Sequence, residues 1–330
     1  MGLILGSLAL GAGFAVVGSA IYALFPSQLA ALYLDTERPD AAAVLAFAAP
    51  LIVLGGGLLL TTGRGLDALT LGEETAHSLG VDVGGVRGRV VIGVKDDQPG
   101  LGFKDATTGQ YSGFDIEIAR LVAAKLGFAA DKIDYKTVPS AAREDAIARG
   151  EVDYYVGTYT INDNRKQRVG FAGPYFVAHQ DLLVRRNDTE ITGPEALDGK
   201  TLCSVPGTTS AAYVTSHYLG NIKLLEKPRF SDCVTALANS EVDAVTTDDV
   251  ILAGFAAQPQ YQGKLKVVGK GFSDEIYGVG VKKGNADLVG KVNAALKQYI
   301  DDGSWRRSLD NNVRPSGYSI PDPPTVASGA

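Results

Sequence analysis

Arg165 follows closely behind two hydroxyl residues, Thr158 and Thr160, in this chain of 330 residues. A planar guanidinium group donates two parallel hydrogen bonds to one carboxylate, which the ammonium group of a lysine does not do. The two threonines can add hydroxyl and backbone groups to the same anion. The residues alone are equally compatible with a carboxylate-binding site and with a surface arginine paired with Asp163.

A second candidate anion site is the segment 206–210, just before a helical stretch expected to begin near Ala211. The first N–H groups of a helix are free to bind an anion, and a glycine there allows close approach. Thr208, Thr209 and Ser210 carry hydroxyls in the same segment. The alternative is an ordinary helix N-cap by Thr208 or Thr209, and both functions are compatible because they share the same donors.

The other reactive side chains form no recognisable catalytic or metal site. His77, His179 and His217 share no metal-ligand spacing, no Ser/His/Asp set is apparent, and the glycine-rich segments do not match a phosphate loop. The net charge of −6 and the pI near 5.2 argue against the basic face that a nucleic-acid-binding protein needs. We expect no catalytic residue, no metal, no cofactor and no nucleic-acid partner.

Strand and helix patterns alternate from Arg89 onward. Val90–Val94 is a β-branched run, typical of a buried parallel strand. Apolar residues at 114, 118, 121, 122 and 126 predict a helix that packs by one face. Such alternation predicts an α/β fold.

The segment 146–156 recurs 90 positions later as 236–246. Each copy reads as a helix end, a tight turn and a strand that begins at a Val-Asp pair. Chance similarity is one interpretation, and two lobes of similar α/β build are the other. Open α/β sheets bind ligands at the carboxyl ends of their strands, so the second interpretation places a ligand between two lobes.

The first 63 residues differ in composition from the rest. Two uncharged runs, about 2–25 and 41–63, are each long enough to cross a bilayer core, which takes about 20 apolar residues. We expect a transmembrane helical hairpin. The alternative is a cleavable signal peptide, but the start of the chain lacks the basic residues of one.

The stretch 24–35 inside this region resembles part of a MATE-type multidrug exporter. About 60 residues are too few for a transporter, so this resemblance implies a fragment or a fusion.

Motifs of the second part resemble the extracellular solute-binding proteins of family 3, the polar amino-acid receptors of ABC importers. Lys95–Gly100 is similar to the glutamate-binding branch of high-GC Gram-positive bacteria. The other motifs are Gly113–Leu126, Gly157–Arg165, Phe171–Tyr175 and Asp198–Ser210, in the family's order. The resemblance implies a two-lobe periplasmic-binding-protein-like fold with a hinge.

In such a fold the chain divides as follows. Residues 64–88 are a linker, 89–176 with 278–314 form lobe 1, 177–277 form lobe 2 with the hinge strands, and 315–330 are a Pro-rich tail.

The resemblance also implies roles for the site residues. A zwitterionic amino acid loses water around two charges in a cleft, so each charge needs a partner. Arg165, with Thr158 and Thr160, would bind the α-carboxylate. Asp248 follows the second repeated strand and would bind the ammonium group, with Asp249 as its rival.

Three residues bear on side-chain specificity. Glutamine-binding relatives have an acidic residue at the end of the first strand, where this chain has Lys95, and a cation suits a ligand carboxylate. Arg143 is a second cation, and its alternative is an exposed helix start next to Glu144. Ser140 replaces an aromatic residue that many relatives stack on the ligand.

Cys203 and Cys233 fall in the same lobe. A disulfide between them would contribute on the order of 3 kcal/mol, and the alternative is two reduced thiols. An oxidised pair requires an extracytoplasmic location, which would place both termini outside the membrane.

These observations predict a membrane-tethered receptor on the extracytoplasmic face of the cell membrane. It would bind an amino acid, with glutamate expected and aspartate, glutamine and asparagine as the alternatives, and present it to ABC permease subunits without chemical change. A cyclohexadienyl-dehydratase-like enzyme and an amino-acid sensor are the alternatives on the same fold.

Overall fold

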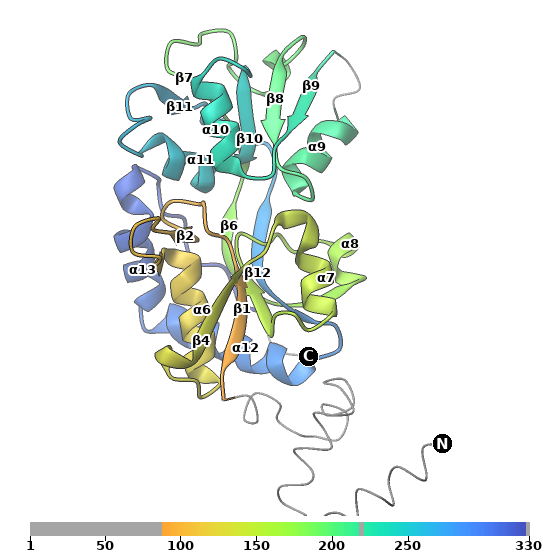
Figure 1. The fold of residues 1–330 in the computed structure, drawn as a ribbon, viewed down its shortest axis with the longest axis vertical. Helices are drawn as coiled ribbons and strands as arrows, with labels where there is room; N and C mark the ends of the chain where they lie inside the picture. Colours follow the sequence, from red (N-terminus) through yellow and green to blue (C-terminus); the bar gives the residue numbers. More distant parts are fainter. Residues whose placement is uncertain (1–87, 218–220, 328–330) are drawn as a thin grey trace, which may run out of the picture. The chain divides into compact units, whose positions relative to one another are not determined.

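The computed structural model describes residues 88–217 and 221–327. The expected transmembrane hairpin at 2–25 and 41–63 lies outside the described residues. Within the described ranges, no helix is both long and apolar enough to cross a membrane. The described residues build two α/β lobes, each around its own sheet (Figure 1).

Lobe 1 contains a five-stranded sheet in the order β4-β1-β5-β12-β6. Strand β1 pairs in parallel with β4 and β5, whereas β12 is antiparallel to β5 and β6. The strands are β1 (Val90–Val94), β4 (Ile133–Thr137), β5 (Tyr154–Val156), β6 (Val169–Ala178) and β12 (Glu275–Lys282). The predicted strand at 90–94 is therefore β1.

Five helices belong to lobe 1: α6 (Phe114–Lys125), α7 (Arg143–Ala148), α8 (Asp163–Lys166), α12 (Ala286–Asp301) and α13 (Ser304–Asn312). The predicted helix at 114–126 is α6, with Leu126 as its C-cap. Phe114 of α6 lies 5.9 Å from Phe176 of β6 and 6.4 Å from Trp305 of α13, measured between ring centroids. Helices from distant parts of the chain thus share one core with the sheet.

Lobe 2 contains a second five-stranded sheet, in the order β11-β7-β10-β8-β9. The strands are β7 (Gln180–Arg185), β8 (Thr201–Ser204), β9 (Lys223–Glu226), β10 (Ala244–Asp248) and β11 (Leu265–Val267). Strand β8 is parallel to β9 and β10, and β7 is antiparallel to β10. The helices are α9 (Thr209–His217), α10 (Phe230–Ala238) and α11 (Asp249–Ala256).

Short elements complete the described residues. A hairpin of β2 (Phe103–Lys104) and β3 (Tyr111–Ser112) follows β1. The 3-10 turns are η1 (Ala130–Lys132), η2 (Ser140–Ala142), η3 (Pro194–Ala196) and η4 (Arg314–Ser316).

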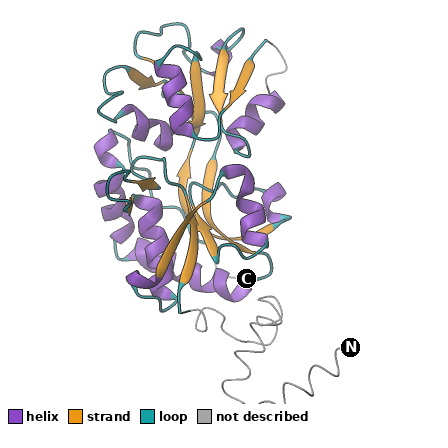
Figure 2. Ribbon diagram, viewed as in Figure 1, coloured by secondary structure: helices purple, strands orange, loops and turns teal. Residues whose placement is uncertain are grey.

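Two crossing segments, 178–180 and 273–275, connect the lobes. Strand β6 of lobe 1 continues past His179 into β7 of lobe 2, and the chain returns where β12 begins at Glu275, opposite Ala178 (Figure 2). Only two strands therefore carry the covalent connection within the described part, which is the arrangement of a hinge.

The two repeated segments have the same local structure. In lobe 1, the Asp153 carboxylate accepts a hydrogen bond from the Val91 N–H at 2.7 Å, and in lobe 2 Asp243 accepts one from Thr201 at 2.8 Å. The turns before them place Gly150 and Ser240 at positive φ, 68° and 61°. The strands begin one residue after these aspartates rather than at the Val-Asp pair, and each carboxylate bonds to the first or second residue of the neighbouring strand.

Candidate functional site

A cavity of about 10 Å³ lies between the two lobes, near the carboxyl ends of their parallel strands. It is lined by Gln98, Ser140, Arg143, Thr158, Thr208, Thr209, Ser210, Phe230, Thr247, Asp248 and Ile251. Seven of the ten predicted ligand-binding residues are in this lining. The other three are Lys95, Thr160 and Arg165. Lys95 donates to Ser140 of the lining, and Arg165 donates both to the Thr160 carbonyl and to the Gly207 carbonyl beside Thr208.

Arg165 lies in α8, whose N-cap Asn162 accepts the backbone N–H of Arg165 at 2.9 Å. Its side chain is only 7% exposed. Nη1 donates to the Thr160 carbonyl at 2.7 Å and Nη2 to the Gly207 carbonyl of lobe 2 at 3.2 Å. Burial, and then the neighbouring Arg143, lowers the pKa of Arg165 to about 10. Asp163 pairs with Lys166 instead, so the surface-pair alternative for Arg165 is wrong.

Arg143 is 2% exposed, so the exposed helix start considered for it is wrong. Its guanidinium carbon lies 4.2 Å from the centre of the Tyr159 ring, and Nη2 donates to the Gly207 carbonyl at 3.2 Å. Nε is buried without a hydrogen-bond partner among the described residues. Glu144 accepts from the Tyr159 hydroxyl at 2.8 Å and lies 3.4 Å from Nε of Arg165. Arg143 thus retains a donor for an oxygen atom in the cavity.

Lys95 follows β1 and is buried, with Nζ donating to Oγ of Ser140 at 2.7 Å. In the part of the chain that the structure describes, no carboxylate lies within salt-bridge distance of this ammonium group. Burial and the charge of Arg143 lower the pKa of Lys95 to about 7, against the opposing effect of Asp97. Ser140 stands where many relatives have an aromatic residue, and here its hydroxyl accepts the hydrogen bond that positions Lys95.

Thr158 has a positive φ of 43°, a backbone conformation that a threonine rarely adopts. Its N–H donates to the buried Asp115 carboxylate at 2.9 Å, which also accepts from the Tyr175 hydroxyl at 2.8 Å. Burial raises the pKa of Asp115 to about 6. The Thr158 hydroxyl pairs with the side-chain amide of Gln98, at 3.1 Å from Nε2 and 3.2 Å from Oε1. Because the N–H and the hydroxyl are both engaged, Thr158 offers the cavity mainly its carbonyl.

The loop before α9 lies opposite the arginines. Oγ of Thr208 accepts the N–H of Ala211 at 3.1 Å, so Thr208 caps the helix as one alternative proposed. The Ser210 hydroxyl is 1% exposed and has no partner among the described residues. Gly207 has a φ of +77°, and a Cβ there would lie 2.5 Å from Cα of Ala141 in lobe 1. A side chain at position 207 would therefore hold the lobes apart.

Asp248 ends β10, is buried and lines the cavity, where it accepts a hydrogen bond from the Tyr277 hydroxyl. Burial and the charge of Glu275 raise its pKa well above the ordinary range. Asp249, the rival, instead accepts from the His179 and Val250 N–H groups and from the Tyr318 hydroxyl. The geometry therefore favours Asp248 as the acid of the cavity.

Sequence reasoning missed six residues of this region. Four of them line the cavity: Gln98, Phe230, Thr247 and Ile251. Tyr159 contacts both arginines, and Glu275 accepts hydrogen bonds from both lobes. The sequence signal for Glu275 was its place near the end of the segment 177–277, which was expected to contain the hinge strands. A carboxylate that must be buried at a hinge needs several donors, and their positions depend on the folded lobes.

The predicted disulfide between Cys203 and Cys233 is present, with a Cα–Cα distance of 5.5 Å. It joins β8, the strand before the Pro206–Ser210 loop, to α10. The disulfide thus fixes β8, which leads into this loop, to α10 of the same lobe.

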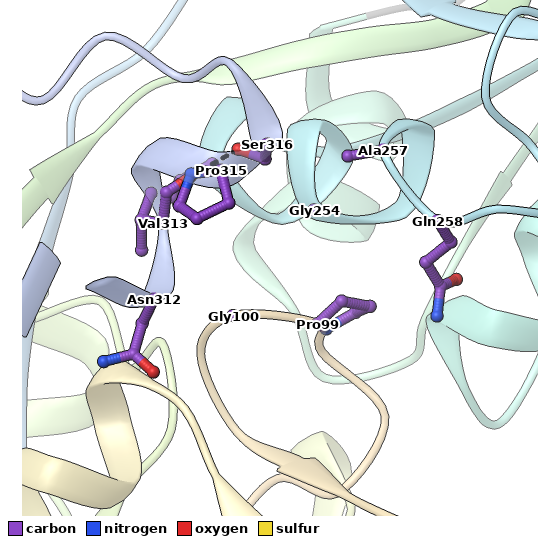
Figure 3. Close-up of a pocket in the computed structure, with 10 residues that line it drawn as sticks. Pro99, Gly100, Gly254, Ala257, Gln258, Asn312, Val313, Pro315 and Ser316 are labelled. Carbon is purple, nitrogen blue, oxygen red and sulfur yellow. Dashed lines mark hydrogen bonds between the residues drawn. The ribbon is translucent and has the colours of Figure 1, made fainter. Parts of the chain in front are cut away.

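A second and larger cavity, of about 220 Å³, also lies where the two lobes meet (Figure 3). It is lined by Pro99, Gly100, Val250, Gly254, Ala257, Gln258, Asn312, Val313, Pro315 and Ser316. None of these side chains is charged, so the larger cavity cannot offer partners to both charges of a zwitterion. The smaller, charged cavity is therefore the candidate site.

The family model of the bacterial extracellular solute-binding proteins, family 3, matches residues 90–313. The glutamate-binding protein GluB of Corynebacterium efficiens is 41% identical over 236 residues, which cover 68% of this chain and 79% of that protein. A solved structure of an ancestral arginine-binding protein bound to arginine is similar with a TM-score of 0.64 at 32% identity. It covers 68% of this chain and 98% of its own.

A separate similarity covers 20% of this chain. Over 65 residues the chain is 63% identical to the probable multidrug resistance protein NorM of Rhizobium meliloti. These residues cover 14% of the length of NorM. The stretch 24–35 resembles the same class of protein.

The match over residues 90–313 and the solved structure confirm the predicted family and the predicted two-lobe fold. This chain belongs to the bacterial extracellular solute-binding proteins, family 3.

Proposed function

We propose that this protein binds an amino acid with an acidic side chain, glutamate first, and presents it to an ABC importer. The observation that carries the proposal is the cluster of three buried cations, Lys95, Arg143 and Arg165, on the lobe 1 side of the cavity. Asp248 faces them from lobe 2. Buried charges are costly without partners, so this arrangement favours a ligand with two carboxylates and one ammonium group.

Each charge of glutamate has a candidate partner. Arg165 and the N–H groups at the start of α9 suit the α-carboxylate, while Asp248 suits the ammonium group. Lys95 and Arg143 suit the side-chain carboxylate. Nε of Arg143 can donate to it, because this atom lies 3.8 Å from Oε1 of Glu144 and makes no hydrogen bond among the described residues. Glutamine would leave Lys95 and Arg143 with a neutral amide, and arginine would place a third cation beside them.

Ligand entry requires the lobes to separate. The cavity holds about one water molecule, which is far less than an amino acid needs. Both arginines of lobe 1 donate to the Gly207 carbonyl of lobe 2, so the lobes are in contact here. We propose that the crossing segments open the lobes to admit the ligand, and that the permease engages the closed form.

Several further features belong to the proposal. The name of the Corynebacterium relative supports glutamate as ligand and a role as binding protein rather than enzyme. The disulfide and the family support an extracytoplasmic location. We propose that the N-terminal hairpin tethers the protein to the membrane, with the domain division given above.

Calorimetry on the purified full chain in mild detergent tests the function. We expect saturable binding of glutamate, weaker binding of aspartate and glutamine, and no turnover of a prephenate-type substrate. Arg165→Ala should cost about 2–5 kcal/mol of binding free energy, because it removes one member of a buried charge pair. Arg168→Ala, which removes an exposed arginine paired with Asp145, is the control and should bind normally. Absence of binding for every amino acid would refute the proposal.

A further inference from the structure

The Glu275 carboxylate lies at the second crossing segment, where it bonds to both lobes. It is 3% exposed. Oε2 accepts hydrogen bonds from the hydroxyls of Thr160 in lobe 1, at 2.5 Å, and of Thr209 in lobe 2, at 2.8 Å. Oε1 accepts hydrogen bonds from Nε2 of Gln180 at 2.6 Å and from the Ser273 hydroxyl at 3.0 Å. Four donors therefore surround one buried acid.

The hydrogen bonds to Glu275 determine whether the Thr160 and Thr209 hydroxyls can donate or only accept. An ionised carboxylate only accepts hydrogen bonds, and a threonine hydroxyl has a single proton. With both protons directed at Glu275, the two Oγ atoms keep only lone pairs for other partners. They can accept from an ammonium group, but they cannot donate to a carboxylate.

The neighbouring hydroxyls differ. The Thr208 hydroxyl donates to the Val205 carbonyl at 2.7 Å and accepts a hydrogen bond from the Ala211 N–H, so its single proton is already used. The Ser210 hydroxyl has no partner among the described residues and remains able to donate. The lining is thus divided into donors, such as Ser210 and Arg143, and acceptors.

Asp248 lies on the acceptor side. Tyr277 connects Asp248 to Thr160. Its hydroxyl donates to the Asp248 carboxylate, and its backbone forms an isolated β-bridge with Thr160. The charge of Glu275 is close enough to contribute to the raised pKa of Asp248. Two acids that repel each other in a buried place are stabilised when a cation enters between them.

We propose that Glu275 is a positioning residue that turns the Thr160 and Thr209 hydroxyls into acceptors, and so makes the site require an amino group on its ligand. This inference rests on the proposed function and deepens it. It also revises the role predicted for Thr160, whose hydroxyl serves the ammonium group rather than the carboxylate.

Glutarate tests the inference, because it is glutamate without the amino group. We expect the wild-type full chain to prefer glutamate over glutarate by about 100-fold or more in calorimetric Kd. Glu275→Gln keeps the shape, but its amide donates to one or both threonine oxygens and frees their protons. The preference should then fall by about tenfold or more, mainly through weaker glutamate binding. Glu151→Gln, which removes an exposed carboxylate of lobe 1, should keep the wild-type ratio.

Two other results would overturn the inference. If Glu275→Gln weakens both ligands equally, or leaves the ratio unchanged, Glu275 serves only the structure of the hinge. If Glu275→Gln does not fold, Thr209→Val decides, since it removes one of the two hydroxyls and must also lower the ratio. A wild-type chain that binds no amino acid refutes the proposed function itself, and this is seen before any variant is compared.

Discussion

Lys95 is buried next to other positive charges, and this environment disfavours its own charge. Burial and Arg143 lower its pKa to about 7, whereas Asp97 and Asp96 act in the opposite direction. A ligand carboxylate would supply the missing counter-charge. The lysine is thus a group whose protonation and ligand binding must be linked.

We expect glutamate affinity to fall as the pH rises above about 7. Above that pH, Lys95 is neutral in the free protein, so binding must take up a proton, at a cost of about tenfold in Kd per pH unit up to about pH 9. Glutamine should be affected less. Calorimetry from pH 6 to 9, in buffers of different ionisation enthalpy, measures both affinity and proton uptake.

Lys95→Met should remove this pH dependence. A wild-type affinity that is constant from pH 6 to 9 would contradict the assignment. The folding stability of the unliganded protein changes with pH in the opposite direction. Between pH 7 and about 10, Lys95 is protonated in the unfolded chain but neutral in the folded one, so the free energy of unfolding increases as the pH rises through this range.

At the residue scale, part of the site was predictable. Lys95 and Thr158 follow strands whose sequence patterns are clear, and Asp248 is the last residue of such a strand. Parallel strands place residues of this kind at one edge of a sheet. Glu275 and Phe230 were not predictable in the same way. Their positions depend on how the two lobes approach each other, and no local pattern encodes that approach.

At the scale of elements, α11 meets the loop after β1 at very short range. A Cβ on Gly254 of α11 would lie 2.4 Å from the Pro99 carbonyl oxygen of lobe 1, and both residues line the larger cavity (Figure 3). The closed arrangement therefore depends on the absence of a side chain at this position of the helix.

Gly254→Ala should oppose lobe closure and weaken glutamate binding by about tenfold, because a backbone oxygen cannot easily move aside. Alanine favours the helix itself by about 1 kcal/mol, so the unliganded chain should keep its thermal stability. Calorimetry and the radius of gyration from X-ray scattering, with and without glutamate, measure the effect.

Gly290→Ala in α12 is the matched control, since a Cβ there meets nothing within 4 Å. It should bind glutamate like the wild type. Equal affinities for Gly254→Ala and Gly290→Ala would show that the contact between α11 and Pro99 does not limit closure.

Local elements were also largely predictable from the sequence. The strand at 90–94, the helix from 114 and the repeated helix–turn–strand units follow from periodicity and turn residues. The capping by Asp153 and Asp243 was not, because each carboxylate caps a strand more than 40 residues away in the chain.

At the scale of the whole described structure, ion pairs join the lobes outside the cavity. Arg229, before α10 in lobe 2, donates to Asp96 at 2.9 Å and lies 3.8 Å from Asp97. The N–H of Ser231 donates to Asp97 at 3.1 Å. These contacts link the end of β1 to the start of α10 and exist only while the lobes are together.

Arg229→Ala should weaken glutamate binding by no more than about fivefold, because the arginine is about half exposed and such pairs contribute at most about 1 kcal/mol. Raising the salt concentration should reduce the difference from wild type. Lys297→Ala, which breaks an exposed pair within α12, should bind normally at every salt concentration. A larger loss that persists in high salt would contradict this weak, screened role.

The position of β12 has a consequence for biosynthesis. Lobe 2 is one continuous segment between the crossing segments, whereas the lobe 1 sheet has β12, from the far end of the chain, between β5 and β6. A ribosome delivers residues in order, so lobe 2 can assemble while lobe 1 still lacks an interior strand. Lobe 1 must therefore be completed last, although it contains the earlier residues.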